Sequence, residues 1–151
     1  MEGPFMSDQD IPSPSDLKKM TAQADAARAE EELSRLHKKE DEERERREGF
    51  MAQGLRDDVR ERVNRALKRA AESNLTRVKA MEFSATYLAD GGRAVNNADP
   101  EWPKSLQGWA ARGYEFFQKE LAPKGYRLHA EISEFDKSGV PKTVIVEVVW
   151  S

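Results

Sequence analysis

The first part of the chain has the pattern of one long helix with apolar positions on two opposite sides. Ser13 is a suitable N-cap, and Asp16 would lie near the positive end of the helix dipole. Neither Gly nor Pro interrupts the pattern from residue 15 until Gly49, which we expect to stop the helix. The pattern therefore predicts a charged helical arm over residues 13–49, preceded by a disordered tail over residues 1–12.

Two apolar seams run along this helix, and neither is long. One has the spacing of a coiled coil but then meets Glu31 and Ser34, and the other lies on the opposite side and then meets Glu40 and Glu43. A sustained coiled coil needs about three or four heptads, so docking on a partner protein or a second copy is favoured over a long autonomous coiled coil. The residues expected to contact the partner are Leu17, Met20, Ala24, Ala27, Leu33 and Leu36.

From residue 37 to residue 49 the pattern contains no aliphatic side chain. Acids stand four residues before bases there, and each such pair stabilises an exposed helix by about 0.2–0.5 kcal/mol. The expected pairs are Glu40 with Arg44, Glu42 with Arg46 and Glu43 with Arg47. Gly49 and Gly54 then bracket two large apolar side chains, Phe50 and Met51, which predicts a hinge over residues 50–54.

Residues 55–151 have the patterns of a small α+β domain. Amphipathic helices are expected over residues 55–73 and 103–121. Residues 76–88 fit a helix or a strand, and a strand is preferred because the hairpin over residues 126–150 would be marginal alone. The predicted fold is α+β: a long charged N-terminal helix, then a small α-β-α-β-β domain with a three-stranded, mainly antiparallel sheet covered by helices on one face.

The last strand of this hairpin has apolar side chains on both faces. Val144, Val146 and Val148 face one way, whereas Ile145 and Val149 face the other. This pattern is typical of a central or well-covered strand.

Composition places part of the chain outside any core. Charged residues make up 35% and hydrophobic residues 38%, against about 25% and about 45–50% in ordinary domains. The absence of cysteine excludes disulfide and thiolate chemistry and fits a reducing compartment. Without a secretion signal or an apolar run of about 18 residues, we expect a cytoplasmic protein with no membrane association. Met6 would also make an ordinary start, which leaves open whether residues 1–5 are native.

Charge is unevenly distributed along the sequence. Residues 1–54 carry 9 Lys/Arg and 14 Asp/Glu, a net charge of −5, whereas residues 55–151 carry 16 and 14, a net charge of +2. Seven basic and two acidic residues fall within residues 60–79, and such a patch attracts polyanions. Association with nucleic acid through this basic helix is an alternative function. Its expected contacts share one helix face and are Arg62, Arg65 and Arg69.

The loop over residues 89–103 is the second alternative, a site for a small molecule or an anion. Adjacent glycines can present backbone N–H groups, and an arginine and two amides stand beside them. The residues concerned are Gly91, Gly92, Arg93, Asn96 and Asn97. A tight turn with capping side chains explains the same residues and is the favoured interpretation. The spacing matches neither a P-loop nor a dinucleotide-binding motif, so no cofactor is expected.

Neither histidine completes a metal or catalytic site in the sequence. His37 and Asp41 could share a helix face, but two ligands without a third make no metal site. His129 is expected on the more polar face of the hairpin, as an exposed cross-strand partner without a nucleophile. With no catalytic residue and no metal predicted, the sequence favours a non-enzymatic protein–protein interaction or assembly module that uses the arm.

Several segments between residues 76 and 150 carry a resemblance. They are DGGRAVNN at residues 90–97, Pro-Glu-Trp-Pro at residues 100–103, GYEFFQKEL and PKGYRL within residues 113–128, and a final strand that ends at Trp150. About half of the chain thus resembles small bacterial proteins of the alphaproteobacterial type that share a DGGRA[VI]NN segment. The resemblance implies a bacterial, cytoplasmic origin and carries over neither an activity nor a functional residue.

Overall fold

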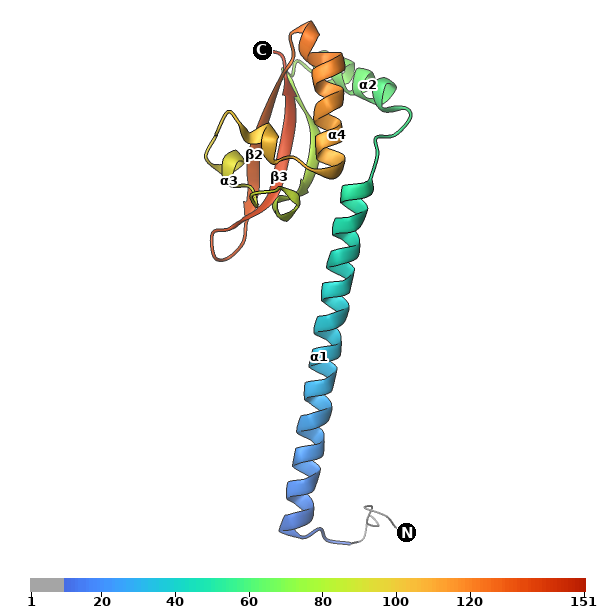
Figure 1. Cartoon of the computed structure of the whole chain (residues 1–151), viewed down its shortest axis with the longest axis vertical. Helices are drawn as coiled ribbons and strands as arrows, with labels where there is room; N and C mark the ends of the chain where they lie inside the picture. The colour runs from blue at the N-terminus through green and yellow to red at the C-terminus, as the bar shows by residue number, and fades with distance from the viewer. Residues whose placement is uncertain (1–9) are drawn as a thin grey trace. The chain divides into compact units, whose positions relative to one another are not determined.

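The computed structural model of the chain describes residues 10–151, which fall into two compact units, Met1–Glu45 and Arg46–Ser151. The question about residues 1–5, and the predicted disorder of residues 1–9, lie outside the described residues. One helix, α1 (Pro14–Ala52), makes up most of the described first unit and contributes its last turns to the second (Figure 1).

The start of α1 is held by a reciprocal pair of hydrogen bonds, as the sequence predicts. The Ser13 amide donates to the Asp16 carboxylate at 3.0 Å, and the Asp16 amide donates to the Ser13 hydroxyl at 3.1 Å. Two of the backbone donors that a helix start leaves unpaired are satisfied in this way. The predicted boundary at Ser13 is confirmed.

The end of α1 differs from the prediction. The helix continues through Gly49 to Ala52, and the boundary between the compact units falls after Glu45. Phe50 is buried against the rings of Phe83 and Tyr87, with ring centroids 5.6 and 4.5 Å away. The expected stop at Gly49 is wrong because burial of this aromatic side chain outweighs the cost of about 1 kcal/mol for a helical glycine.

The charged part of α1 also pairs differently from the expected pattern. Arg44 bonds to Asp41 rather than to Glu40, and Arg28 bonds to Asp25, so these acids stand three residues before their bases. Arg47 donates to the backbone oxygen of Thr86 at 2.5 Å instead of pairing with Glu43. Residues three and four apart are both neighbours on a helix, so periodicity alone does not choose between them.

The second unit contains ten further elements, and the predicted α+β class is confirmed (Figure 1). In chain order they are α2 (Val59–Glu72), β1 (Arg77–Ser84), η1 (Ala85–Tyr87), α3 (Arg93–Asn96), η2 (Trp102–Ser105), α4 (Gly108–Phe116), the π-helical η3 (Phe117–Leu121), η4 (Ala122–Lys124), β2 (Arg127–Phe135) and β3 (Pro141–Val149). Among the described residues, no helix is both long and apolar enough to cross a membrane.

The three strands form one antiparallel sheet in the order β1-β3-β2. The last strand is therefore central, as its apolar residues on both faces predicted. Val144, Val146 and Val148 are buried on one face, together with Met81 and Phe83 of β1. This face joins the helices in two neighbouring core clusters, one around Ala110 of α4 and Val95 of α3, the other around Phe117 and Leu121 of η3.

A β-bulge explains why residues 76–88 fitted a helix and a strand equally well. The pairing of β1 with β3 shifts between Lys79 and Met81, so Ala80 is an extra residue without a partner. Val78 and Met81 consequently pair with Val148 and Val146 on the same face although they are three residues apart. A three-residue spacing normally indicates a helix, and the bulge produces it in a strand.

Both predicted helices of the second unit are shorter than expected. The α2 helix begins at Val59 rather than at residue 55, and it ends at the predicted place. Asn74 adopts φ 62° there, and the Leu75 amide donates to the Ala70 oxygen at 2.9 Å, which together form a Schellman C-cap.

The helix expected over residues 103–121 is divided. Leu106 and Gln107 are extended and separate η2 from α4, and a π-helical segment follows α4. Gly108 follows the break with φ +55°, and a Cβ atom there would lie 2.6 Å from the Phe50 oxygen. The break therefore lets the chain pass directly against the end of α1, a tertiary contact that helical periodicity does not reveal.

Candidate functional site

The large apolar side chains of the arm are exposed in the structure. Leu17, Met20, Leu33 and Leu36 expose 50%, 55%, 54% and 52% of their surface. Ala24 and Ala27, the other expected contact residues, are exposed as well. The arm residues of both predicted seams are therefore available to a partner.

The last turns of α1 belong to the core of the second unit. Phe50 and Met51 pack in the larger core cluster. The Arg112 guanidinium of α4 donates to the backbone oxygens of Met51 and Gln53 at 2.9 and 3.0 Å. A cation at a helix C-terminus stabilises the carbonyl groups that have no partner within the helix, so this end of α1 is firmly anchored.

The predicted anion loop binds a carboxylate of its own chain. The Asp90 carboxylate accepts hydrogen bonds from the amides of Gly92 and Ala94 at 3.0 and 2.9 Å. Gly92 is buried, and a Cβ atom there would lie 3.2 Å from the Cβ of Pro141. Asn96, Asn97 and Arg93 are exposed. Of the two glycine amides expected to cradle a ligand, that of Gly92 thus binds Asp90 and that of Gly91 donates to the Leu88 oxygen at 3.2 Å, in agreement with the turn interpretation.

The arginines of α2 that were expected to contact nucleic acid are exposed to solvent. They are Arg62, Arg65 and Arg69. Arg60, which precedes them, pairs with Glu120 at 2.5 Å. The three arginines expected to contact nucleic acid therefore remain available for such a contact.

A cavity of about 300 Å³ lies between α2, β1 and α4, and sequence reasoning missed it. Its walls are formed by aliphatic and aromatic side chains of all three elements, with Gly113 where α4 faces β1. A Cβ atom on Gly113 would lie 2.7 Å from the sulfur of Met81. The half-buried state of Val59, Val63 and Ala66 reflects this cavity, since all three line it.

The charged side chains that line this cavity are all cations. They are Arg56 and Arg62; Lys79 also borders the cavity, but its position opposite Glu147 in the sheet places its side chain on the open sheet face. Arg56 donates to Asp58 at 3.1 Å and thereby lowers the pKa of that carboxyl, whereas Lys79 pairs with Glu82 at 2.6 Å. Within residues 10–151, Arg62 forms no ion pair.

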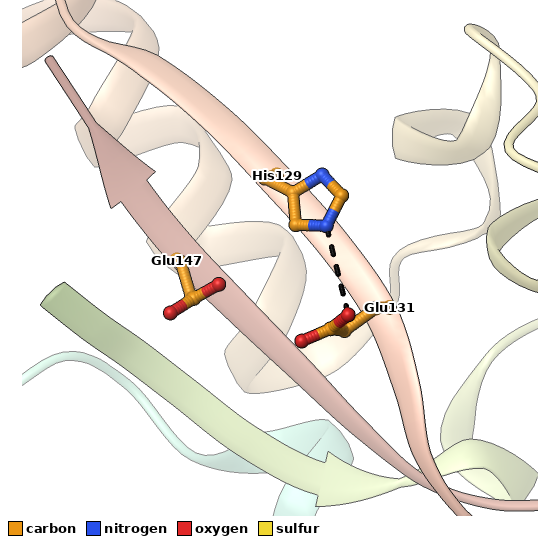
Figure 2. A group of neighbouring side chains, drawn as sticks. All are labelled: His129, Glu131 and Glu147. Atoms are coloured by element: carbon orange, nitrogen blue, oxygen red, sulfur yellow. Dashed lines mark ion pairs between the residues drawn. The ribbon is translucent and has the colours of Figure 1, made fainter. Parts of the chain in front are cut away.

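Three neighbouring side chains that could ligate a metal, His129, Glu131 and Glu147, lie on the sheet face opposite the helices (Figure 2). His129 faces Glu147 across β2 and β3, and its Nε2 lies 3.8 Å from a carboxylate oxygen of Glu131. One nitrogen and two carboxylates are a donor set that Zn²⁺ accepts. However, the Arg77 guanidinium holds Glu147 at 3.0 Å. Glu147 is therefore already paired within the chain, and His129 has the exposed cross-strand position that the sequence predicts.

Comparisons with protein-family models, with curated proteins and with solved structures each find no match. The resemblance of residues 76–150 to small alphaproteobacterial proteins therefore stays a prediction, and function rests on the geometry of the chain itself.

Proposed function

We propose that the chain is a non-enzymatic protein–protein interaction module that docks on a partner through the arm part of α1, residues 17–36. The observation that carries the proposal is the half-exposed state of Leu17, Met20, Leu33 and Leu36. The second unit holds its own core clusters, which contain none of these four residues. The apolar surface of the arm thus remains available to another molecule.

The size of this surface indicates a weak or transient complex. Full burial of a Leu or Met side chain contributes about 1.5–3 kcal/mol, so burying the exposed halves of these four contributes about 4 kcal/mol. Association costs about 4–15 kcal/mol in lost freedom. The partner must therefore add apolar surface of its own, which another amphipathic helix does. A second copy of this chain is the simplest such partner.

The charged stretch after Leu36 defines where docking stops. From residue 37 to residue 49 no aliphatic side chain occurs, and all of these residues are exposed. Ion pairs such as Arg44 with Asp41 support the helix there without a partner. Partner contacts should consequently be confined to the first two thirds of the arm.

Photo-crosslinking tests the proposal directly in cells. A photoreactive side chain at Leu36 should crosslink to a second protein or a second copy, whereas the same side chain at Glu43 should not. Sedimentation over a range of concentrations then separates self-association from binding to another protein. No crosslink at Leu36, or equal crosslinking at both positions, would rule out docking through the arm.

A paired substitution provides the matched control. Leu33→Gln with Leu36→Gln should abolish the crosslink or the concentration-dependent association, because both apolar contacts are lost. Glu32→Gln with Arg35→Gln leaves net charge and apolar surface unchanged and should leave association intact. If both double variants lose association equally, the apolar contacts are not the specific cause of binding. If both keep it, the arm does not bind through Leu33 and Leu36.

The exposed arginines of α2 support a second candidate function, association with nucleic acid. Arg62, Arg65 and Arg69 are exposed residues of one helix. Binding to mixed-sequence DNA or RNA should weaken steeply with salt, because each phosphate contact releases counterions. Arg62→Ala with Arg69→Ala should lower both the affinity and the salt dependence. Absent or salt-independent binding would remove this candidate.

A further inference from the structure

The α2 helix covers the sheet incompletely. Its sequence is strongly amphipathic, and such a helix normally buries its apolar stripe. Here only Ala70, near its C-terminal end, is buried. Val59, Val63 and Ala66 are half-buried and line the cavity, and of these Val63 also packs against the core cluster around Phe117. The gap is therefore a feature of the N-terminal half of the helix.

Two local features keep the cavity open. The bulge at Ala80 interrupts the alternation of β1, so that Val78 and Met81 both present their side chains to the cavity and residues 79 and 80 border it. Gly113 contributes no side chain to the wall of α4. Trp109 also lines the cavity, and its indole packs edge-on against Phe50 with ring centroids 6.1 Å apart. The space is consequently shaped by β1 and α4, with α2 as its cover.

The size and lining of the cavity restrict what can fill it. Its volume of about 300 Å³ lies at the lower end of the about 300–1,000 Å³ typical of small-molecule sites. Apart from Arg56 and Arg62, the side chains that line it are aliphatic or aromatic. A nucleotide or sugar would lose its hydrogen bonds to water there without replacement. An apolar body of modest size fits.

The cations add a requirement for negative charge. Arg56 is already paired with Asp58, whereas Arg62 forms no ion pair within the described residues 10–151. A guanidinium presents parallel donors that match a carboxylate. We propose that this cavity binds an amphipathic monocarboxylate of medium chain length, with its hydrocarbon tail between α2, β1 and α4 and its carboxylate on Arg62.

Chain length and head group should both determine affinity. Each buried methylene strengthens binding about fourfold, so decanoate binds more tightly than octanoate until the cavity is filled. Decanol places the same tail without the ion pair, and we expect about tenfold weaker binding, because a hydrogen bond to a charged group is lost. Decyltrimethylammonium carries the charge that Arg62 and Arg56 repel, and it should bind most weakly.

Calorimetric titration of the full chain with these four ligands is the test, with the charged ligands kept below their micelle concentrations and decanol below its solubility limit. Arg62→Gln should weaken decanoate binding about tenfold and leave decanol unchanged. Arg65→Gln is the matched control, since Arg65 is an exposed arginine of the same helix that does not line the cavity. No decanoate binding at millimolar concentration overturns the proposal. Equal effects of the two substitutions, or equal binding of decanoate and decanol, overturn the role of Arg62.

The location of binding is tested separately. Ala66→Phe places a large ring in the cavity and should abolish binding of decanoate and decanol alike. Circular dichroism tests whether this variant is folded. If it is unfolded, the NMR amide shifts that decanoate induces in the unaltered protein locate the binding site instead. Amide shifts centred on Ala80 and Gly113 support binding in the cavity. Shifts confined to the arm or to the open sheet face contradict it, and so does a folded Ala66→Phe variant that still binds decanoate.

Discussion

Gly108 shows how a single residue fixes the joint between α1 and the rest of the second unit. A Cβ atom at this position would lie 2.6 Å from both the Phe50 oxygen and the Met51 Cα, and the backbone adopts φ +55°. Both obstacles are backbone atoms, so no side chain can move aside. The close approach therefore requires glycine for steric and conformational reasons together.

We expect Gly108→Ala to destabilise the protein by about 2–4 kcal/mol, because the α1 end must move out of the core. Urea unfolding of the full chain measures the change. Gly49→Ala is the control. Gly49 lies within α1, and a Cβ atom there meets nothing within 4 Å, so this substitution should stabilise by about 0.5–1 kcal/mol. Equal effects of the two substitutions would mean that the α1 end does not press on Gly108.

Arg112 acts on the same joint through hydrogen bonds. Its guanidinium holds the Met51 and Gln53 oxygens, which lack helical partners. Arg112→Met should cost about 1–3 kcal/mol, since two carbonyls lose a charged donor, and amide exchange over residues 50–53 should accelerate. Arg93→Met, at an exposed position, should change neither quantity. Unchanged amide exchange over residues 50–53 in the Arg112 variant would show that water replaces the guanidinium without loss of local stability.

At the scale of elements, the α1 start is sensitive to pH. The Ser13 amide donates to the Asp16 carboxylate, and this bond, followed by the one with the Ser13 hydroxyl, lowers the pKa of Asp16 below its ordinary 3.8. A carboxylate with a lowered pKa stabilises the folded state fully above its ordinary pKa. This contribution is lost as the pH falls through the lowered pKa. We expect the first turn to fray in acid.

A pH titration followed by NMR measures this. The Cα shifts of residues 14–17 should move towards coil values as pH falls below 3.8, while those of residues 25–30 stay helical. Asp16→Asn should remove the transition, since the amide does not titrate in this range. A transition of equal size in the variant would assign it to other carboxylates.

The elements also show where sequence reasoning succeeds and where it fails. The Ser13 cap and the central position of β3 were predicted, because residue propensity and hydrophobic periodicity within a short segment are enough to indicate them. The bulge at Ala80 and the break before Gly108 were not. Both depend on contacts between residues distant in sequence, Val148 with Val78 and Phe50 with Gly108. The cavity was missed for the same reason, since its lining residues come from helices and strands that are distant in sequence.

At the scale of the whole molecule, the position of Phe50 decides where the second unit begins. Sequence patterns suggested that a domain starts at residue 55, after a hinge. The compact unit is Arg46–Ser151, and Phe50 is buried in its larger core cluster against Phe83, Tyr87 and Trp109. The last turns of α1 are thus part of the α+β core, and a cut at Gly54 removes a wall of that core.

Two truncations give the last prediction. A chain starting at Arg46 retains both core clusters and should unfold cooperatively, with Phe50 still buried. A chain starting at Gly54 lacks Phe50 and Met51 and should be less stable by about 3–5 kcal/mol, the cost of deleting a buried aromatic side chain. Urea unfolding of the two chains measures the difference. In the full-length protein, Phe50→Ala should reproduce most of this loss of stability, because it leaves the space of the Phe50 ring empty while the helix remains. If both truncated chains unfold at the same urea concentration, α1 contributes nothing to the core, and the arm would have to be considered as ending at a true hinge.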